Sequence, residues 1–181
     1  MTARDIQTLE MMPLGPLSGK SFGTSISPWV ITLDALNPFA QSSPELEKTV
    51  AIHLQDPQSN TYDVTFSVSI NSTKVCTTHL NTLYWTFRQM LAHMCVGGCS
   101  LRTGDLLACG TLSGKGDNEH GCLLETTWGG AKPLKLGDGS ERVFLHDGDV
   151  VSMTGLAGGE SSGVGFGDCT GVVKPARPLR W

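Results

Sequence analysis

Glycine and proline are spread along the whole of this 181-residue sequence, and their number limits what the chain can fold into. The chain contains 22 glycines and 9 prolines, residues that favour turns and interrupt helices and strands. Many short strands separated by turns are therefore expected, without a regular alternation of strands and crossover helices. Hydrophobic residues make up 39% of the chain, which is enough for one core, so residues 1–181 are expected to form a single domain.

Several segments show the patterns of β-strands. Residues 61–70 alternate polar and apolar side chains with the period of a half-buried strand. The sequence His-Asp-Gly-Asp at 146–149 favours a hairpin turn. Gly163, Gly165 and Gly167 predict close packing of a last strand in a β-roll. Further strands are expected at 50–54, 106–109, 122–128, 143–145, 150–154 and 164–173.

One helix is expected over residues 81–94. Apolar side chains recur there in steps of four, four and three residues, which places them on one helix face that should be buried. Asn81 suits an N-cap, and the Gly-Gly pair at 97–98 suits a helix end. The predicted fold class is α+β, mainly β: a mixed β-sandwich roll with one principal helix. The four apolar residues are Leu83, Phe87, Leu91 and Met94.

Charge and hydropathy exclude some classes of partner. The formal net charge of -4 and the pI near 5.7 argue against nucleic acid, which is bound by basic surfaces. No apolar run approaches the roughly 18 residues of a membrane span, so no membrane partner is expected. Residues 1–7 lack the features of a signal peptide, and a cytoplasmic protein is expected. The six cysteines are irregularly spaced, which favours buried free thiols over disulfides.

The most specific feature of the sequence is an ordered series of short motifs. Near the N-terminus these are Ala-Arg-Asp-Ile-Gln at 3–7, Pro-Leu-Gly-Pro at 13–16, Gly-Lys-Ser-Phe-Gly-Thr at 19–24 and Ile-Ser-Pro-Trp at 26–29. Their order resembles the signature of the fumarylacetoacetase family. The motif at 13–16 favours this branch over the smaller relatives of the superfamily. The resemblance continues at 84–86, 89–93, 101–102, 104–107, 110–114, 124–125, 147–149 and 164–167.

The resemblance implies a reaction and its requirements. Enzymes of this family hydrolyse the carbon–carbon bond of 4-fumarylacetoacetate to fumarate and acetoacetate, the last step of tyrosine and phenylalanine catabolism. The chemistry needs a divalent metal to hold the diketone oxygens, an activated water and stabilisation of the departing carbanion. Mg²⁺ and Ca²⁺ are therefore the expected cofactors, a small diketo acid is the expected ligand, and a homodimer is the expected assembly.

The resemblance also implies roles for individual residues. Arg4, Gln7 and Lys20 would donate to a developing oxyanion. Gln7 and Thr111 would contact the substrate. Lys20 and Thr24 would lie beside a magnesium ion. An ammonium group cannot coordinate a cation, so Lys20 could contact the metal only through its backbone carbonyl.

Two simpler interpretations compete with these roles. Arg4 could form a surface pair with Asp5. The Gly-Lys-Ser sequence at 19–21 could end a phosphate-binding loop, but Leu14 stands where that loop requires a glycine. The nucleotide interpretation therefore fails on spacing.

Glu125 is the most informative carboxylate. A strand at 122–128 would place it on the same face as Leu123 and Thr127, where an acidic group needs a partner. The resemblance implies that Glu125 orients a catalytic histidine that activates water. The alternative is an exposed glutamate on the polar side of a strand.

Some residues that the resemblance requires are expected to lie outside this sequence. The metal's carboxylate ligands and the catalytic histidine would precede Ala3, which predicts an N-terminally truncated catalytic domain. Met11 replaces a substrate-contacting tyrosine of the family, and the residues at 162–163, Ser-Gly, replace a Tyr-Arg pair. Two hypotheses follow: part of a genuine hydrolase, or a non-catalytic remnant that either binds full-length subunits or is unstable. An upstream reading frame encoding Asp-Trp-Ser or a similar sequence would favour the first.

Overall fold

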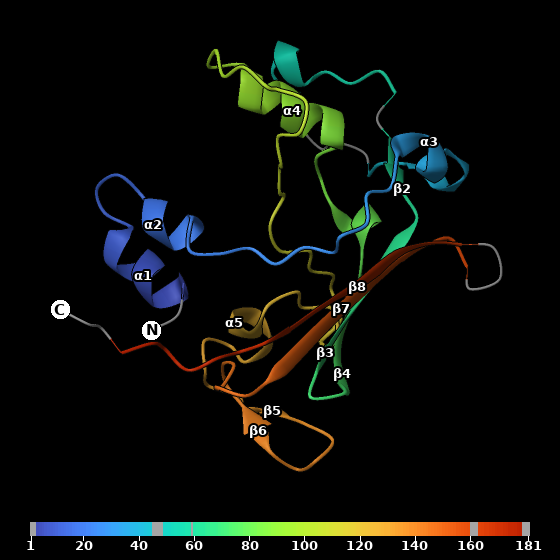
Figure 1. Ribbon diagram of the computed structural model, residues 1–181. Helices are drawn as coiled ribbons and strands as arrows, with labels where there is room; N and C mark the ends of the chain where they lie inside the picture. The colour runs from blue at the N-terminus through green and yellow to red at the C-terminus, as the bar shows by residue number, and fades with distance from the viewer. Residues whose placement is uncertain (1–2, 45–48, 59, 160–162, 179–181) are drawn as a thin grey trace.

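The computed structural model describes residues 3–44, 49–58, 60–159 and 163–178. Within these ranges the chain is mixed α+β, with all eight strands in antiparallel sheets (Figure 1), as the sequence predicts for the fold class. In chain order the elements are α1 (Ala3–Glu10), α2 (Leu17–Lys20), α3 (Leu33–Leu36), η1 (Asn37–Phe39), β1 (Ala40–Ser42), η2 (Ile52–Leu54), β2 (Asn60–Tyr62), β3 (Val64–Ile70), β4 (Thr73–His79), η3 (Leu80–Thr82), α4 (Phe87–Cys95), α5 (Leu123–Thr126), β5 (Leu134–Lys135), β6 (Glu141–Arg142), β7 (Val150–Ala157) and β8 (Val164–Val172).

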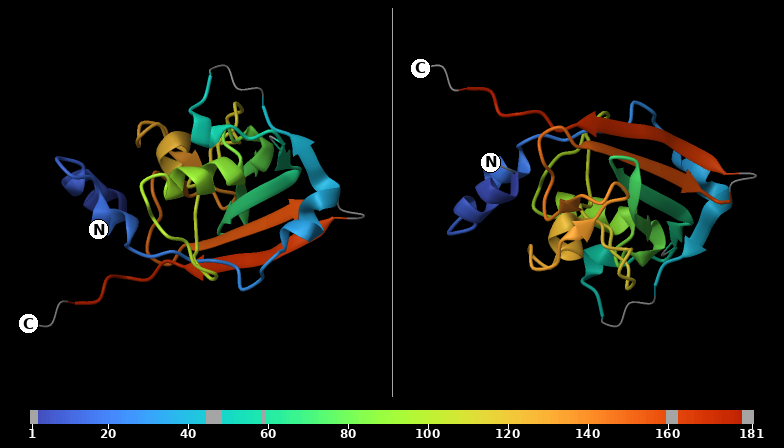
Figure 2. Two further views of the ribbon diagram at one scale, coloured as in Figure 1. Left: turned by 90° about the horizontal axis from the view of Figure 1, so that it is seen from above. Right: turned by 90° about the horizontal axis from the view of Figure 1, so that it is seen from below.

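The main sheet contains four antiparallel strands in the order β4-β3-β7-β8. Strands β3 and β4 form a hairpin whose two loop residues, Asn71 and Ser72, have φ values of 49° and 66°. Two left-handed residues in a row suit the right-handed twist of a hairpin. Strands β1 with β2 and β5 with β6 form two further pairs. Both views in Figure 2 show α1 and α2 standing apart from the main sheet.

The hydrophobic core lies at one end of the main sheet, where β2, η3 and the end of β7 meet. Val64 pairs with Ala157 across β3 and β7, and their exposed fractions are 1% and 0%. Burying such side chains contributes roughly 25 cal/mol per Å² of apolar surface. The core is completed by the buried residues Leu36, Tyr62 and Leu80.

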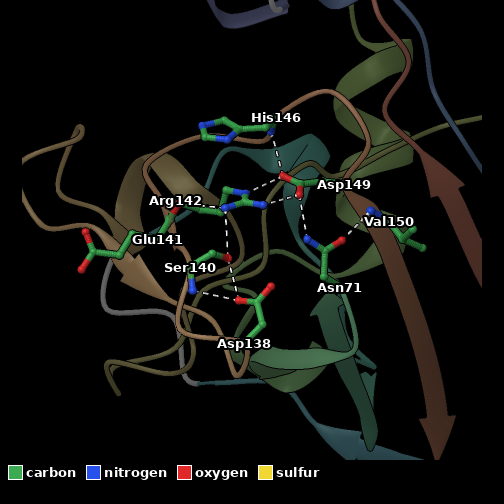
Figure 3. A network of polar contacts seen from close by, with 8 residues as sticks. All are labelled: Asn71, Asp138, Ser140, Glu141, Arg142, His146, Asp149 and Val150. Carbon is green, nitrogen blue, oxygen red and sulfur yellow. Dashed lines mark hydrogen bonds and ion pairs between the residues drawn. The ribbon is translucent and has the colours of Figure 1, made fainter.

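A buried polar network closes the opposite end of the sheet (Figure 3). The Asp149 carboxylate is 2% exposed and accepts hydrogen bonds from the Arg142 guanidinium, from Asn71 Nδ2 at 2.7 Å and from the His146 backbone N–H at 2.8 Å. Asn71 Oδ1 in turn accepts from the Val150 N–H at 2.9 Å. The network therefore joins the β3–β4 turn to β6 and to the start of β7.

Three predicted strands are confirmed and four are wrong. Residues 61–70 lie mostly in β2 and β3, residues 150–154 lie in β7, and the strand predicted at 164–173 is β8, which ends at Val172. Residues 50–54 instead contain η2, 106–109 have no regular structure, 122–128 contain α5, and β6 precedes 143–145. The turn at 146–149 forms, but β6 before it pairs with β5 and no hairpin results. Periodicity alone does not separate short apolar strands from short helices.

The predicted helix begins later than expected. Helix α4 starts after Thr86, whose hydroxyl accepts from Gln89 N while Gln89 Oε1 accepts from Thr86 N, forming a capping box. Thr86 and Gln89 are buried, whereas Phe87, Leu91 and Met94 are 36%, 40% and 50% exposed. The prediction that this apolar stripe is buried is therefore wrong for all but Leu83, which packs against the core.

Close packing explains two of the three glycines that precede or lie in β8. A Cβ at Gly163 would lie 2.5 Å from Ala157 O, and one at Gly167, whose φ is +70°, would lie 2.1 Å from Trp29 Cδ1. A Cβ at Gly165 would meet no atom within 4 Å. All six cysteines are free thiols, but only Cys76 is fully buried. No helix in the described ranges is both long enough and apolar enough to cross a membrane.

Candidate functional site

Arg4 and Gln7 lie one turn apart on α1, and Arg4 Nη1 donates a hydrogen bond to Gln7 Oε1. The spacing of three residues puts both side chains on the same side of the helix. This bond uses the amide oxygen of Gln7 and leaves its NH₂ group, together with the remaining guanidinium N–H groups, available as donors. The structure thus brings together two of the predicted oxyanion donors.

Helix α2 packs directly against α1 through Gly19. A Cβ at Gly19 would lie 2.9 Å from Gln7 N and 3.0 Å from Gln7 Cα, so only glycine fits without movement of the backbone. The Glu10 carboxylate accepts from the N–H groups of Gly19 at 2.9 Å and Ser18 at 3.2 Å, and these bonds lower the pKa of Glu10. Lys20, the last residue of α2, is exposed beside this contact.

The loop before α5 passes closely over the start of that helix. A Cβ at Gly121 would lie 2.1 Å from Leu112 O and 2.9 Å from Thr111 Cγ2. The absence of a side chain at Gly121 therefore allows the predicted substrate-binding residue Thr111 to lie against the N-terminal end of α5. The loop is fixed to the main sheet by a hydrogen bond from Thr77 N in β4 to Asn118 O at 2.9 Å.

Glu125 lies on α5 and not on a strand, so the strand-based assignment of its face is wrong. Its carboxylate is exposed, and Oε2 accepts a hydrogen bond from Ser113 Oγ. Ser113 Oγ accepts in turn from the Gly121 N–H at 3.1 Å. The predicted need for a partner is met by a serine twelve residues away and not by a histidine.

A cavity of about 520 Å³ lies beside this carboxylate. Its lining includes Ser113, His120, Glu125 and Trp128. The His120 Nδ1 atom is buried and has no hydrogen-bond partner among the described residues. Trp128 has a φ of 52°, and Lys132 Nζ lies 4.8 Å from the centre of its ring. The cavity therefore combines a carboxylate, a hydroxyl and an imidazole.

A second, mostly apolar cavity of about 290 Å³ lies between α5 and the main sheet. Arg4 lines it together with residues at the start of α5, including Cys122 and Leu123, and His120 lines both cavities. Arg4 of α1 therefore lines a cavity that reaches the N-terminal end of α5, next to the cavity that Glu125 lines. Lys20 and Thr24 are exposed and line neither cavity.

The sequence motifs imply no role for Ser113, His120 or Trp128. Ser113 lies within the motif at 110–114, two residues after Thr111, and that proximity was the only available signal. His120 precedes Gly121 in an irregular loop, and no periodic pattern in the sequence predicts the course of that loop. Met11, at the position where the resemblance implies a tyrosine, is 59% exposed. Ser162 lies outside the described residues.

The described residues do not by themselves fit a resident divalent cation. They contain no group of three or more His, Cys, Asp or Glu side chains that could hold a metal ion. Lys20 could offer a metal only its backbone carbonyl oxygen, and Thr24 could offer only its neutral hydroxyl and carbonyl oxygens. Ca²⁺ takes about six to eight oxygen ligands, and Mg²⁺ and Ca²⁺ sites usually include carboxylates.

Comparison with known proteins identifies the family. Residues 1–174 match the family model described as Fumarylacetoacetate (FAA) hydrolase C-terminal. Fumarylacetoacetase of Arabidopsis thaliana is 46% identical over 183 residues, which cover 98% of this chain and 43% of that protein. The Homo sapiens fumarylacetoacetase is 45% identical over 181 residues, which cover 97% of this chain and 43% of that protein. The chain thus spans less than half the length of these relatives, and it belongs to the fumarylacetoacetate hydrolase C-terminal family.

Proposed function

We propose that this chain supplies the C-terminal catalytic part of a metal-dependent hydrolase that converts 4-fumarylacetoacetate and water to fumarate and acetoacetate. Membership of the family and similarity to fumarylacetoacetases support this substrate. The observation that carries the proposal is that Arg4 and Glu125 line two cavities that share His120 and Leu124.

Arg4 and Gln7 would stabilise negative charge on oxygen. When water attacks a carbonyl carbon, the carbonyl oxygen becomes an oxyanion, and N–H donors held in advance lower the barrier. The bond between the two side chains fixes their relative orientation and leaves further N–H groups free. Thr111, lying against Gly121, would donate its hydroxyl to the substrate, and Lys20 would add a further cationic donor.

Glu125 would act through an imidazole. An ionised carboxylate only accepts hydrogen bonds, so it would hold an imidazole by accepting its N–H and would stabilise the cation formed when water loses its proton. By resemblance, this imidazole comes from the part of the relatives that the present chain does not span. Carbon–carbon cleavage then leaves an electron pair on the acetoacetate carbon, which takes up a proton.

Mg²⁺ or Ca²⁺ and a homodimer are part of the proposal. The metal would polarise the diketone oxygens, with Thr24 and the Lys20 carbonyl as neighbours and its carboxylate ligands supplied from outside the described residues. Exposed apolar side chains on and beside α1 and α2 support a surface that a second copy covers. These side chains are Leu9, Met12, Leu14 and Leu17.

A chimera tests the proposed function. In it, this chain replaces the matching region of the Arabidopsis thaliana fumarylacetoacetase, which is 46% identical. We expect the purified chimera to release fumarate, to lose activity with a chelator and to regain it with Mg²⁺ or Ca²⁺, and light scattering should show a dimer. A folded chimera without turnover would overturn the proposed function and favour a non-catalytic binding subunit.

A further inference from the structure

The hydroxyl of Ser113 lies between a backbone N–H and the Glu125 carboxylate. It accepts a hydrogen bond from Gly121 N at 3.1 Å and donates one to Glu125 Oε2. A backbone N–H can only donate, so it occupies a lone pair of the hydroxyl and leaves the O–H for the carboxylate. The two contacts together fix the direction of the hydroxyl hydrogen toward Glu125.

The backbone around this hydroxyl is closely constrained. Gly121 has no room for a Cβ, because one would lie 2.1 Å from Leu112 O. The loop closes through the bonds Gly114 N to Glu119 O and Glu119 N to Gly116 O, both 3.0 Å. Together with the bond from Thr77 to Asn118, these contacts fix Ser113 relative to the main sheet.

We propose that Ser113 is a positioning residue, which holds Glu125 Oε2 so that the second oxygen, Oε1, faces a donor in the cavity of about 520 Å³. The proposal rests on the proposed function of Glu125. In the described part of the chain, Ser113 is the donor that contacts this carboxylate. Without it, the exposed side chain would rotate freely, and the imidazole that it orients would lose its fixed direction.

A structural role and a positioning role predict different behaviour. If the hydroxyl only stabilises the loop, then Ser113→Ala lowers stability and leaves turnover by the folded enzyme unchanged. If it positions Glu125, then Ser113→Ala lowers kcat and this effect depends on the presence of the carboxylate. A double-mutant cycle with Glu125→Gln separates the two, because effects transmitted through one residue are not additive.

Kinetics of the chimera test the role. We expect Ser113→Ala to lower kcat about tenfold with little change in KM. Ser113→Thr, which keeps the hydroxyl, should restore most of the rate. When Glu125→Gln is already present, adding Ser113→Ala should not lower kcat any further. The matched control is Ser152→Ala, which removes a hydroxyl bonded to Thr170 Oγ1 at 2.8 Å in the sheet and should leave kcat unchanged.

NMR of the 181-residue chain provides a readout that does not depend on activity. Loss of the Ser113 acceptor should speed hydrogen exchange at the Gly121 amide and shift its proton signal upfield, and the Glu125 ¹³Cδ signal should move. Ser113→Thr should preserve both signals. Unchanged signals in Ser113→Ala, or an unchanged kcat in the chimera, would overturn the proposal. A folded but inactive wild-type chimera would overturn the proposed function, and NMR would still decide whether Ser113 holds Glu125.

Discussion

The guanidinium of Arg142 donates two hydrogen bonds to the carboxylate of Asp149, Nε to Oδ2 and Nη2 to Oδ1, each 2.8 Å long. Asp149 is buried, and its remaining contacts come from Asn71 and the His146 backbone. These donors, with the guanidinium first, hold the pKa of Asp149 well below its usual range despite the opposing effect of burial. The pair links β6 to the start of β7.

Asp149→Asn should destabilise the fold at neutral pH. The amide loses the ionic part of the interaction and leaves the guanidinium without its partner, at a cost of about 3 kcal/mol because Arg142 keeps some contact with solvent. Urea unfolding followed by circular dichroism measures this. The control is Arg88→Met, which breaks the pair with Asp56 and should cost less, because the Arg88 side chain is 46% exposed and Asp56 keeps its bond from Thr86 Oγ1. Equal costs would contradict the account.

The same pair predicts acid sensitivity. Because the pKa of Asp149 is lower in the folded than in the unfolded protein, its stabilisation is fully present above the unfolded value of about 3.9 and is lost progressively below it. The difference in unfolding free energy between wild type and Asp149→Asn should therefore be constant from about pH 8 to pH 5 and shrink below about pH 4. A difference that grows on acidification would have the wrong sign.

His120→Phe should not destabilise the protein. The buried Nδ1 atom has no partner in the described part of the chain, and an aromatic ring of similar shape removes that unpaired atom. The melting temperature should be unchanged or higher. The matched control is His79→Phe, which removes the ring nitrogen that lies 3.1 Å from Thr65 Oγ1. This control should lower the melting temperature. A clear drop for His120→Phe would show that Nδ1 has a partner in solution.

Gly121→Ala should disturb the loop before α5. The added methyl group would meet the carbonyl oxygen of Leu112 at 2.1 Å, and backbone movement of this kind costs about 1–3 kcal/mol. Gly165→Ala is the control, because a Cβ there meets no atom within 4 Å. Thermal unfolding compares them. Equal melting temperatures for the two variants would refute the close approach of the loop to α5.

Sequence patterns predicted a strand best where polar and apolar residues alternate along the chain. Residues 61–70 carry that signal, because successive side chains of a strand point to opposite faces of a sheet. Residues 122–128 do not: Thr127 bonds to Leu123 through both its N–H and its hydroxyl, which fixes a helical turn that an apolar run could not reveal. The missed strand β4 follows a turn of Asn71 and Ser72, without the glycine that usually marks such a hairpin.

The candidate site was predictable where its geometry is local. The three-residue spacing of Arg4 and Gln7 is enough to place them together once α1 forms. The contact between Ser113 and Glu125 spans twelve residues and depends on the path of an irregular loop, which neither propensity nor periodicity specifies. Motif resemblance identified Glu125, and the structure was needed to find the residue that holds it.

The central claim is that Glu125 acts in catalysis by orienting a histidine, and the kcat of Glu125→Gln in the chimera tests it most directly. The amide has the same size but cannot stabilise an imidazolium, so kcat should fall roughly 10²–10⁴-fold while circular dichroism and metal affinity stay nearly unchanged. A loss confined to KM would make Glu125 a substrate contact instead. An unchanged kcat would contradict the account.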